Sequence, residues 1–158
     1  GLGPVRLMDY FAIAGAIAAR YVPGLVTPPA GLTNIAAATA TPPNALAQSP
    51  MVVVWANRGD WVVGASEIRD VPAEFLLNFY YAKHEADMPR ETAALQKWLG
   101  VLRDGLNGQM KLGLGASGVL KAIVTSWQIG VLTYAGIEYD GITIVLHVWA
   151  QETVTLTP

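Results

Sequence analysis

The sequence predicts an α+β fold in which an antiparallel or mixed β-sheet carries helices packed on one face. Two patterns point to this class. Apolar and polar residues alternate over long segments of the C-terminal half, which is typical of half-buried strands. Around Trp98, apolar residues recur instead at helical spacing. The 158 residues are enough for one domain with its own core.

The chain contains 53% hydrophobic and only 14% charged residues, whereas globular proteins average roughly a quarter charged residues. We therefore expect part of the apolar surface to contact another protein. The net charge of -2 and the scattered Lys and Arg residues argue against an ordinary basic face for nucleic acid. The absence of cysteine excludes disulfides, thiolate zinc sites and a cysteine nucleophile, and it fits a reducing compartment.

Residues 1–22 are predicted to form an N-terminal helix, spanning about Val5 to Tyr21. The residues expected to face the core are Leu7, Phe11, Ala14 and Ile17. The apolar run Phe11–Ala19 also resembles the centre of a signal peptide, so export is an alternative. This run is far shorter than the roughly 20 residues that cross a bilayer, and we expect no membrane contact.

Residues 23–50 contain six prolines among Ala, Thr and Asn, a composition that sustains neither a helix nor a central strand. We expect either a flexible surface loop or an arm that becomes ordered only through contacts with neighbouring subunits.

Residues 51–158 are predicted to form the α+β core, which with the helix and arm makes one domain. Met51–Trp55 is β-branched and apolar, and Trp61–Val63 resumes the pattern. The intervening Asn57–Asp60 is expected to be a hairpin turn. This turn contains Arg58-Gly59-Asp60, a tripeptide known from cell adhesion, although a tight turn alone explains its Gly and Asp.

The segment Val71–His84 alternates as a half-buried strand, with Phe75, Leu77, Phe79 and Tyr81 expected on its core face. A helix is predicted from about Met88 to Leu106, capped by Asp87, with Pro89 in its first turn. It should pack on the sheet through a stripe consisting of Leu95, Trp98, Leu99, Leu102 and Leu106.

Gly113 to Gly118 form a complete G-x-G-x-x-G, with Glu138 twenty residues further on. A dinucleotide site requires such glycines to follow a strand and open a helix. Here a helix is expected before them and a strand after them, so we predict a connection and no cofactor.

The last residues are predicted to form two long strands, Val119–Leu132 and Ile142–Leu156, joined by a glycine-marked turn from Tyr134 to Gly141. Alternation in the second strand places four apolar residues on one face and four mixed ones on the other. The first set is Ile142, Ile144, Leu146 and Val148, and the second is Thr143, Val145, His147 and Trp149.

Neither histidine has a partner set typical of a metal site or a catalytic base. His147 is expected to be packed or hydrogen-bonded in its strand. His84, beside Glu85 and Asp87, could bind a metal but is better explained as part of a solvated turn. Glu138 and Asp140, flanking Tyr139, would serve as acid and base only if other groups converged on them. At the exposed tip of a hairpin we expect them to be in contact with water. We therefore predict no catalytic, cofactor-binding or metal-binding residues, and no enzyme.

The C-terminal third carries a resemblance in its spacing of Gly, Tyr and apolar residues. It resembles the tail-terminator, or tail-completion, proteins of long-tailed bacteriophages. The similarity would cover Met51 to Thr157 and the first helix, whereas the arm is longer than the family pattern. The matching runs are Val119-Leu120-Lys121-Ala122-Ile123-Val124, Trp127-x-x-Gly130, Tyr134-Ala135-Gly136-x-x-Tyr139-x-Gly141 and Glu152-x-Val154-Thr155.

The resemblance implies a structural virion protein that catalyses no reaction. It would form a homo-hexameric ring on the tail tube, end tube polymerisation and join the tail to the filled head. Its partners would be copies of itself, the tail-tube protein and a head-tail connector protein, with DNA only passing through the lumen. It would act at the tail-head junction of the virion after assembly in the host cytoplasm. The residues that we expect at partner contacts are Arg58, Asp60, Tyr134, Glu138, Tyr139 and Asp140.

Two other functions remain open at this point. The chain could be another phage connector, such as a head-closure or tail-tube subunit. It could instead be a small-ligand-binding or enzymatic α+β domain, with a pocket wall formed by Trp127, His147 and Trp149.

Overall fold

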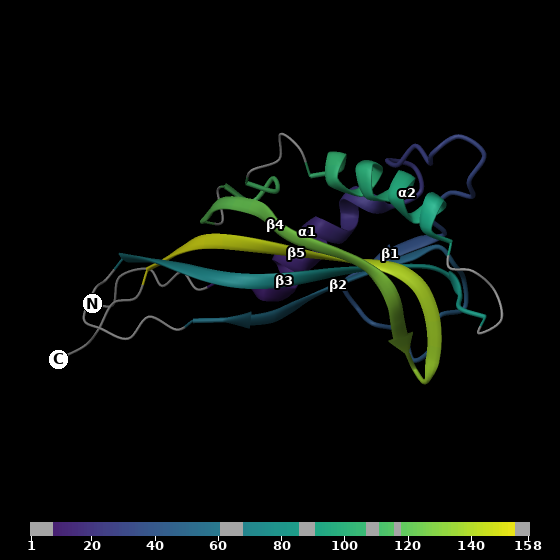
Figure 1. Ribbon diagram of the computed structural model, residues 1–158. Coiled ribbons are helices and arrows are strands. Elements are labelled where there is room, and N and C mark those ends of the chain that lie inside the picture. The colour runs from purple at the N-terminus through teal and green to yellow at the C-terminus, as the bar shows by residue number, and fades with distance from the viewer. Residues whose placement is uncertain (1–7, 61–67, 86–90, 107–110, 116–117, 154–158) are drawn as a thin grey trace.

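The computed structural model describes residues 8–60, 68–85, 91–106, 111–115 and 118–153. Five strands form one sheet in the order β1-β2-β3-β5-β4, in which β1 and β2 are parallel and the other neighbours antiparallel. Figure 1 shows α2 lying over the sheet and the long, curved β4–β5 hairpin in green and yellow. The elements are α1 (Tyr10–Ala18), a 3-10 turn (Ala19–Tyr21), β1 (Ala37–Thr39), β2 (Met51–Gly59), β3 (Ile68–Lys83), α2 (Thr92–Asp104), β4 (Val119–Tyr134) and β5 (Ile137–Thr153).

The main core lies between the helices and one face of the sheet. Alternate residues of β3 and β5 are buried there, as the sequence predicts, and the stripe on α2 packs against them. Because α1 and α2 both contribute to this single cluster, they cover the same face. The predicted α+β fold with helices on one face is confirmed. The buried residues of this layer include Phe75, Leu77, Phe79, Leu95, Trp98, Leu102, Ile142, Ile144, Leu146 and Val148.

The first helix differs from the prediction in its length and in one inward residue. The Asp9 side chain accepts a hydrogen bond from the Ala12 amide at 2.9 Å and so caps α1. Phe11, expected to face the core, is 67% exposed, and Ile13 is buried in its place. This correction follows from the short helix, whose buried stripe starts at Ile13. Leu7 lies outside the described residues.

The predicted turn at Asn57–Asp60 is wrong, because Asn57 to Gly59 belong to β2. The long β3 offers partners as far as Ala73, and a register shift between Ala56 and Arg58 accommodates the extra residue. The expected strand Trp61–Val63 lies outside the described residues.

The connection between α2 and β4 holds the glycine-rich motif. The order of helix, glycines and strand is as predicted, since β4 begins at Val119. The helix itself begins at Thr92 rather than Met88, and the expected cap Asp87 and Pro89 fall outside the described residues.

The predicted turn from Tyr134 to Gly141 is also wrong, because β5 already begins at Ile137. Ala135 and Gly136 have φ angles of 50° and 80°, and two such residues suffice to reverse a β-hairpin. Gly141 is not a turn residue but lies within β5, where an added Cβ would collide with the Phe79 carbonyl. This glycine marks a close approach of two strands.

The arm at residues 23–50 packs on the chain's own sheet. Its only described strand, β1, pairs with Met51–Val53 of β2. Ile35 is buried in the main core, and the Pro43 carbonyl accepts a hydrogen bond from the Tyr134 hydroxyl. The expectation that the arm becomes ordered only through contacts with neighbouring subunits is therefore wrong.

Candidate functional site

The sheet face opposite the helices, which we call the open face, has two unlike ends. At one end, near the β4–β5 turn, a second buried cluster closes the face. At the other end, the side chains are mostly half-buried and belong to neither of the two clusters found in the described residues. We call these the hairpin end and the bare end.

The hairpin end is a largely aromatic cluster built from β2, β3, β4, β5 and the arm. Tyr80 of β3 packs edge-on against Tyr134 and Tyr139, with ring centroids 5.3 Å and 5.7 Å away. Tyr80 and Tyr139 are each only 2% exposed. Burial raises the pKa of the Tyr80 phenol, while the hydrogen bond with Asn78 opposes that shift. Leu46 of the arm packs on the same cluster, so the chain covers this end itself.

On the helix side of the same end, Asp140 is 3% exposed. Its Oδ1 lies 2.8 Å from Nδ1 of His84, and its Oδ2 accepts a bond from the Glu91 amide at 3.5 Å. The expected solvated turn at His84 and the expected water-exposed Asp140 are both corrected by this contact. The pair ties the end of β3 to β5 and to the start of α2.

The bare end is formed by side chains from three neighbouring strands. Leu76 of β3 lies opposite Val145 of β5, and both are half-buried. Ile123 of β4 is 43% exposed and lies opposite His147. The Trp149 ring is also half-buried, and the Lys121 ammonium lies over it, 4.4 Å from the ring centroid. Apolar groups with a polar border are typical of protein interfaces.

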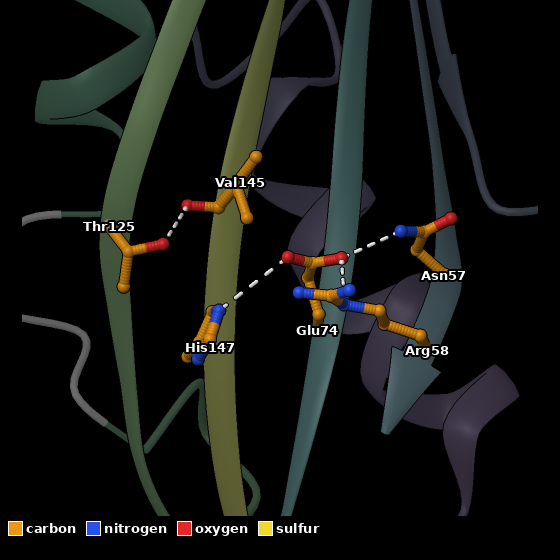
Figure 2. A network of polar contacts seen from close by, with 6 residues as sticks. All are labelled: Asn57, Arg58, Glu74, Thr125, Val145 and His147. Atoms are coloured by element: carbon orange, nitrogen blue, oxygen red, sulfur yellow. Dashed lines mark hydrogen bonds and ion pairs between the residues drawn. The ribbon is translucent and has the colours of Figure 1, made fainter. Parts of the chain in front are cut away.

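A polar network centred on Glu74 borders this apolar group (Figure 2). Oε2 of Glu74 accepts a hydrogen bond from the Asn57 amide at 2.6 Å and lies 3.3 Å from Nε of Arg58. Oε1 lies 3.6 Å from Nε2 of His147. The Arg58 side chain is 78% exposed, so this ion pair contributes little to stability. The ion pair instead fixes the orientation of the Glu74 carboxylate.

A shallow hollow of about 330 Å³ opens beside this network. Glu74 and His147 could polarise or hydrogen-bond a small polar molecule in the hollow, but two contacts of Glu74 are already used by the chain. The hollow is lined by Arg58, Gly59, Asp60, Pro72, Ala73, Glu74 and His147.

The structure separates the expected partner-contact residues into two groups. Arg58 and Asp60 lie at the bare end and are exposed. Tyr134 and Glu138 lie at the hairpin end, where Glu138 is exposed and Tyr134 is half-buried. Tyr139 and Asp140, the other two, are buried within the chain, so the expectation of an exposed tip carrying them is wrong. The short turn explains this, because it places both residues inside the paired part of β5.

The expected pocket wall of Trp127, His147 and Trp149 does not form. Trp127 pairs with Ile144 and therefore lies on the helix side, while His147 pairs with Ile123 on the open face. Only His147 and Trp149 are neighbours, with ring centroids 5.9 Å apart. The extra residue at Thr125, where the register shifts, places Trp127 on the other face.

Sequence reasoning missed Glu74 as the centre of a network. The alternation places both Glu74 and His147 on the outer faces of their strands, but their contact depends on β3 pairing with β5, which the sequence does not reveal. No protein-family model matches the chain, and neither does any curated protein sequence.

In the described residues, no helix has the length and apolar character needed to cross a membrane. The same part of the chain contains no group of three or more His, Asp or Glu side chains placed to hold a metal ion.

Proposed function

We propose that this chain is a structural subunit of a long-tailed bacteriophage, a tail terminator that caps the tail tube as a hexameric ring and joins the tail to the head. The observation that carries the proposal is the bare end of the open face. Leu76, Val145 and Trp149 form a half-buried apolar group on the outside of the sheet, next to the fixed polar network of Glu74. A neighbouring copy in a ring would cover such a surface.

The order of the elements supports the same proposal. The resemblance implies an N-terminal helix, an early hairpin, a helix across the sheet and a closing pair of strands. The chain has α1, the β2–β3 pair, α2 and the β4–β5 hairpin in that order. Another phage connector would share much of this arrangement, so the test must examine ring formation and tail joining together.

The test is negative-stain imaging of the purified protein, followed by a joining assay with purified tails and filled heads. We expect rings of one size and restored joining. Val145→Lys introduces a charge at the bare end and should abolish both, while Gln96→Lys on the exposed side of α2 should change neither. Wild-type protein that forms no ring and joins no tails would refute the proposal.

The hollow beside Glu74 and His147 favours a second candidate, a small-ligand-binding domain. In that case the wild-type protein would be a stable monomer, and His147→Ala would remove ligand binding measured by calorimetry while leaving the mass unchanged. Rings that survive His147→Ala but not Val145→Lys would favour the terminator.

A further inference from the structure

The outer edge of β4 is a free strand edge. Among the described strands, β4 is the last of the sheet and pairs only with β5. In the described part of the chain, its other edge has no backbone partner after Val119. Such an edge presents a row of unpaired N–H and C=O groups that can pair with another strand.

The hairpin geometry shows which backbone groups face outward. In a hairpin with a two-residue turn, the flanking residues, here Tyr134 and Ile137, form a hydrogen-bonded pair. Every second residue of β4 before Tyr134 therefore bonds to β5, and the residues between them point their N–H and C=O outward. The Glu138 carbonyl confirms this phase, because it accepts a bond from the amide of His84, just after β3, rather than from β4. The outward residues are Trp127, Ile129, Val131 and Thr133.

The second half of β4 lacks the features that usually protect an edge strand. From Ser126 to Tyr134 the register with β5 has no shift, and the segment contains no charged residue and no proline. Trp127 in this segment is 49% exposed. The first half, in contrast, contains two register shifts and Lys121.

The opposite edge of the sheet is a poor partner for this segment. There β1 has only three residues. β2 beyond it carries a register shift after Ala56 and the exposed Arg58. Among the described strands, only β4 itself offers a free edge of equal length without a bulge.

We infer that two copies of this chain pair through β4, antiparallel, about a two-fold axis. Full overlap of Ser126–Tyr134 with itself places the axis at Gly130, so that Gly130 faces its own copy. The outward groups of Ile129 then meet those of the partner's Val131, and those of Trp127 meet the partner's Thr133. This pair is the form of the dilute subunit before rings assemble.

The two-fold pair is independent of the proposed ring. A contact that each copy makes through the same surface closes after two copies and cannot by itself build a six-fold ring. A linked pair without rings would therefore refute only the tail function, and rings without a linked pair would refute only this inference.

Single-cysteine cross-linking tests the pair directly, because the chain has no cysteine of its own. In Gly130→Cys the two thiols would face each other across the axis, at a Cα separation of about 4.5 Å that suits a disulfide. A side chain at Gly130 has open space around it. The matched control is Thr133→Cys, on the same edge and exposed, which would face the partner's Trp127 instead of itself.

Under mild oxidation we expect Gly130→Cys to give linked dimers about tenfold faster than Thr133→Cys, since pairing raises the local thiol concentration. Circular dichroism of both reduced variants checks that they fold. A second variant, Thr133→Pro, removes one outward N–H without touching the bonds to β5. In dilute, unassembled protein it should shift the mass measured by sedimentation from two chains to one. Equal linking rates, or a wild-type mass that is not reduced by Thr133→Pro, would overturn the inference.

Discussion

The two ends of the open face share the same strands but are completed differently. At the hairpin end, three tyrosines and two apolar residues of β2 form a closed cluster under the arm. At the bare end, the arm is absent, and Leu76, Val145 and Trp149 border a polar network that is partly exposed. The comparison suggests that the first end serves the stability of the subunit and the second serves contact with another molecule.

The largest difference between the ends should appear at Tyr139. We expect Tyr139→Ala to lower the free energy of unfolding by about 3–5 kcal/mol, because it leaves a cavity beside Tyr80. Urea denaturation measures the change. Its neighbour Glu138 is exposed, and Glu138→Ala should stay within about 0.5 kcal/mol. Similar effects of the two substitutions would show that the hairpin end is not a packed cluster.

The carboxylates of the two ends should also differ. Asp140→Ala leaves His84 and the Glu91 amide without a buried acceptor, and should cost about 1–3 kcal/mol of unfolding free energy. Glu74→Ala removes the partner of Arg58 and His147, whose side chains water can reach. It should therefore lower the free energy of unfolding by less than about 1 kcal/mol. Thermal unfolding of both variants at neutral pH checks the order, and the reverse order would contradict it.

Alkaline pH should destabilise the hairpin end. Burial raises the pKa of Tyr80 above its unfolded value near 10, so the folded state resists losing that proton. Stability should be constant up to about pH 9 and then fall by about 1.4 kcal/mol per pH unit for this group, until the pH passes its folded pKa. Burial also raises the pKa of Tyr21 in the main core. Urea titrations of wild type and Tyr80→Phe from pH 7 to 11 should show a shallower loss in the variant. An equal loss of stability in the two proteins would show that Tyr80 does not cause the destabilisation at alkaline pH.

The arm's contact with the hairpin should contribute only a small part of the stability of the hairpin end. Tyr134→Phe removes the hydrogen bond to the Pro43 carbonyl and should cost about 1 kcal/mol. Because that contact holds the arm over the cluster, limited proteolysis should cut residues 40–49 faster in the variant. Unchanged cleavage would show that Leu46 and the other apolar contacts hold the arm without Tyr134.

Periodicity predicted the strands and the α2 stripe because burial repeats along them at a fixed spacing. It placed Ile142 to Val148 and Leu95 to Leu102 correctly for this reason. It failed where one residue changes the phase or where a turn is shorter than its composition suggests. Thr125 moves Trp127 to the helix side, and the Ala135-Gly136 turn moves Tyr139 into the sheet.

The candidate site was less accessible to sequence reasoning. The sequence predicts Arg58 and Asp60 at a partner contact, and both lie exposed at the bare end. The hairpin turn predicted around them does not form, because Arg58 belongs to β2. Glu74 and His147 meet only because β3 and β5 are neighbours, and the arm's position over the hairpin end depends on contacts between distant segments. Neither is encoded in local spacing.

The most direct measurement is the accessibility of a thiol at the bare end before and after assembly. Val145→Cys should react quickly with a maleimide in dilute, unassembled protein and slowly in the assembled form, as mass spectrometry of the labelled chains would show. Gln96→Cys on the exposed side of α2 should react at the same rate in both forms. Equal labelling of Val145→Cys in the two forms would contradict the claim that another copy covers the bare end.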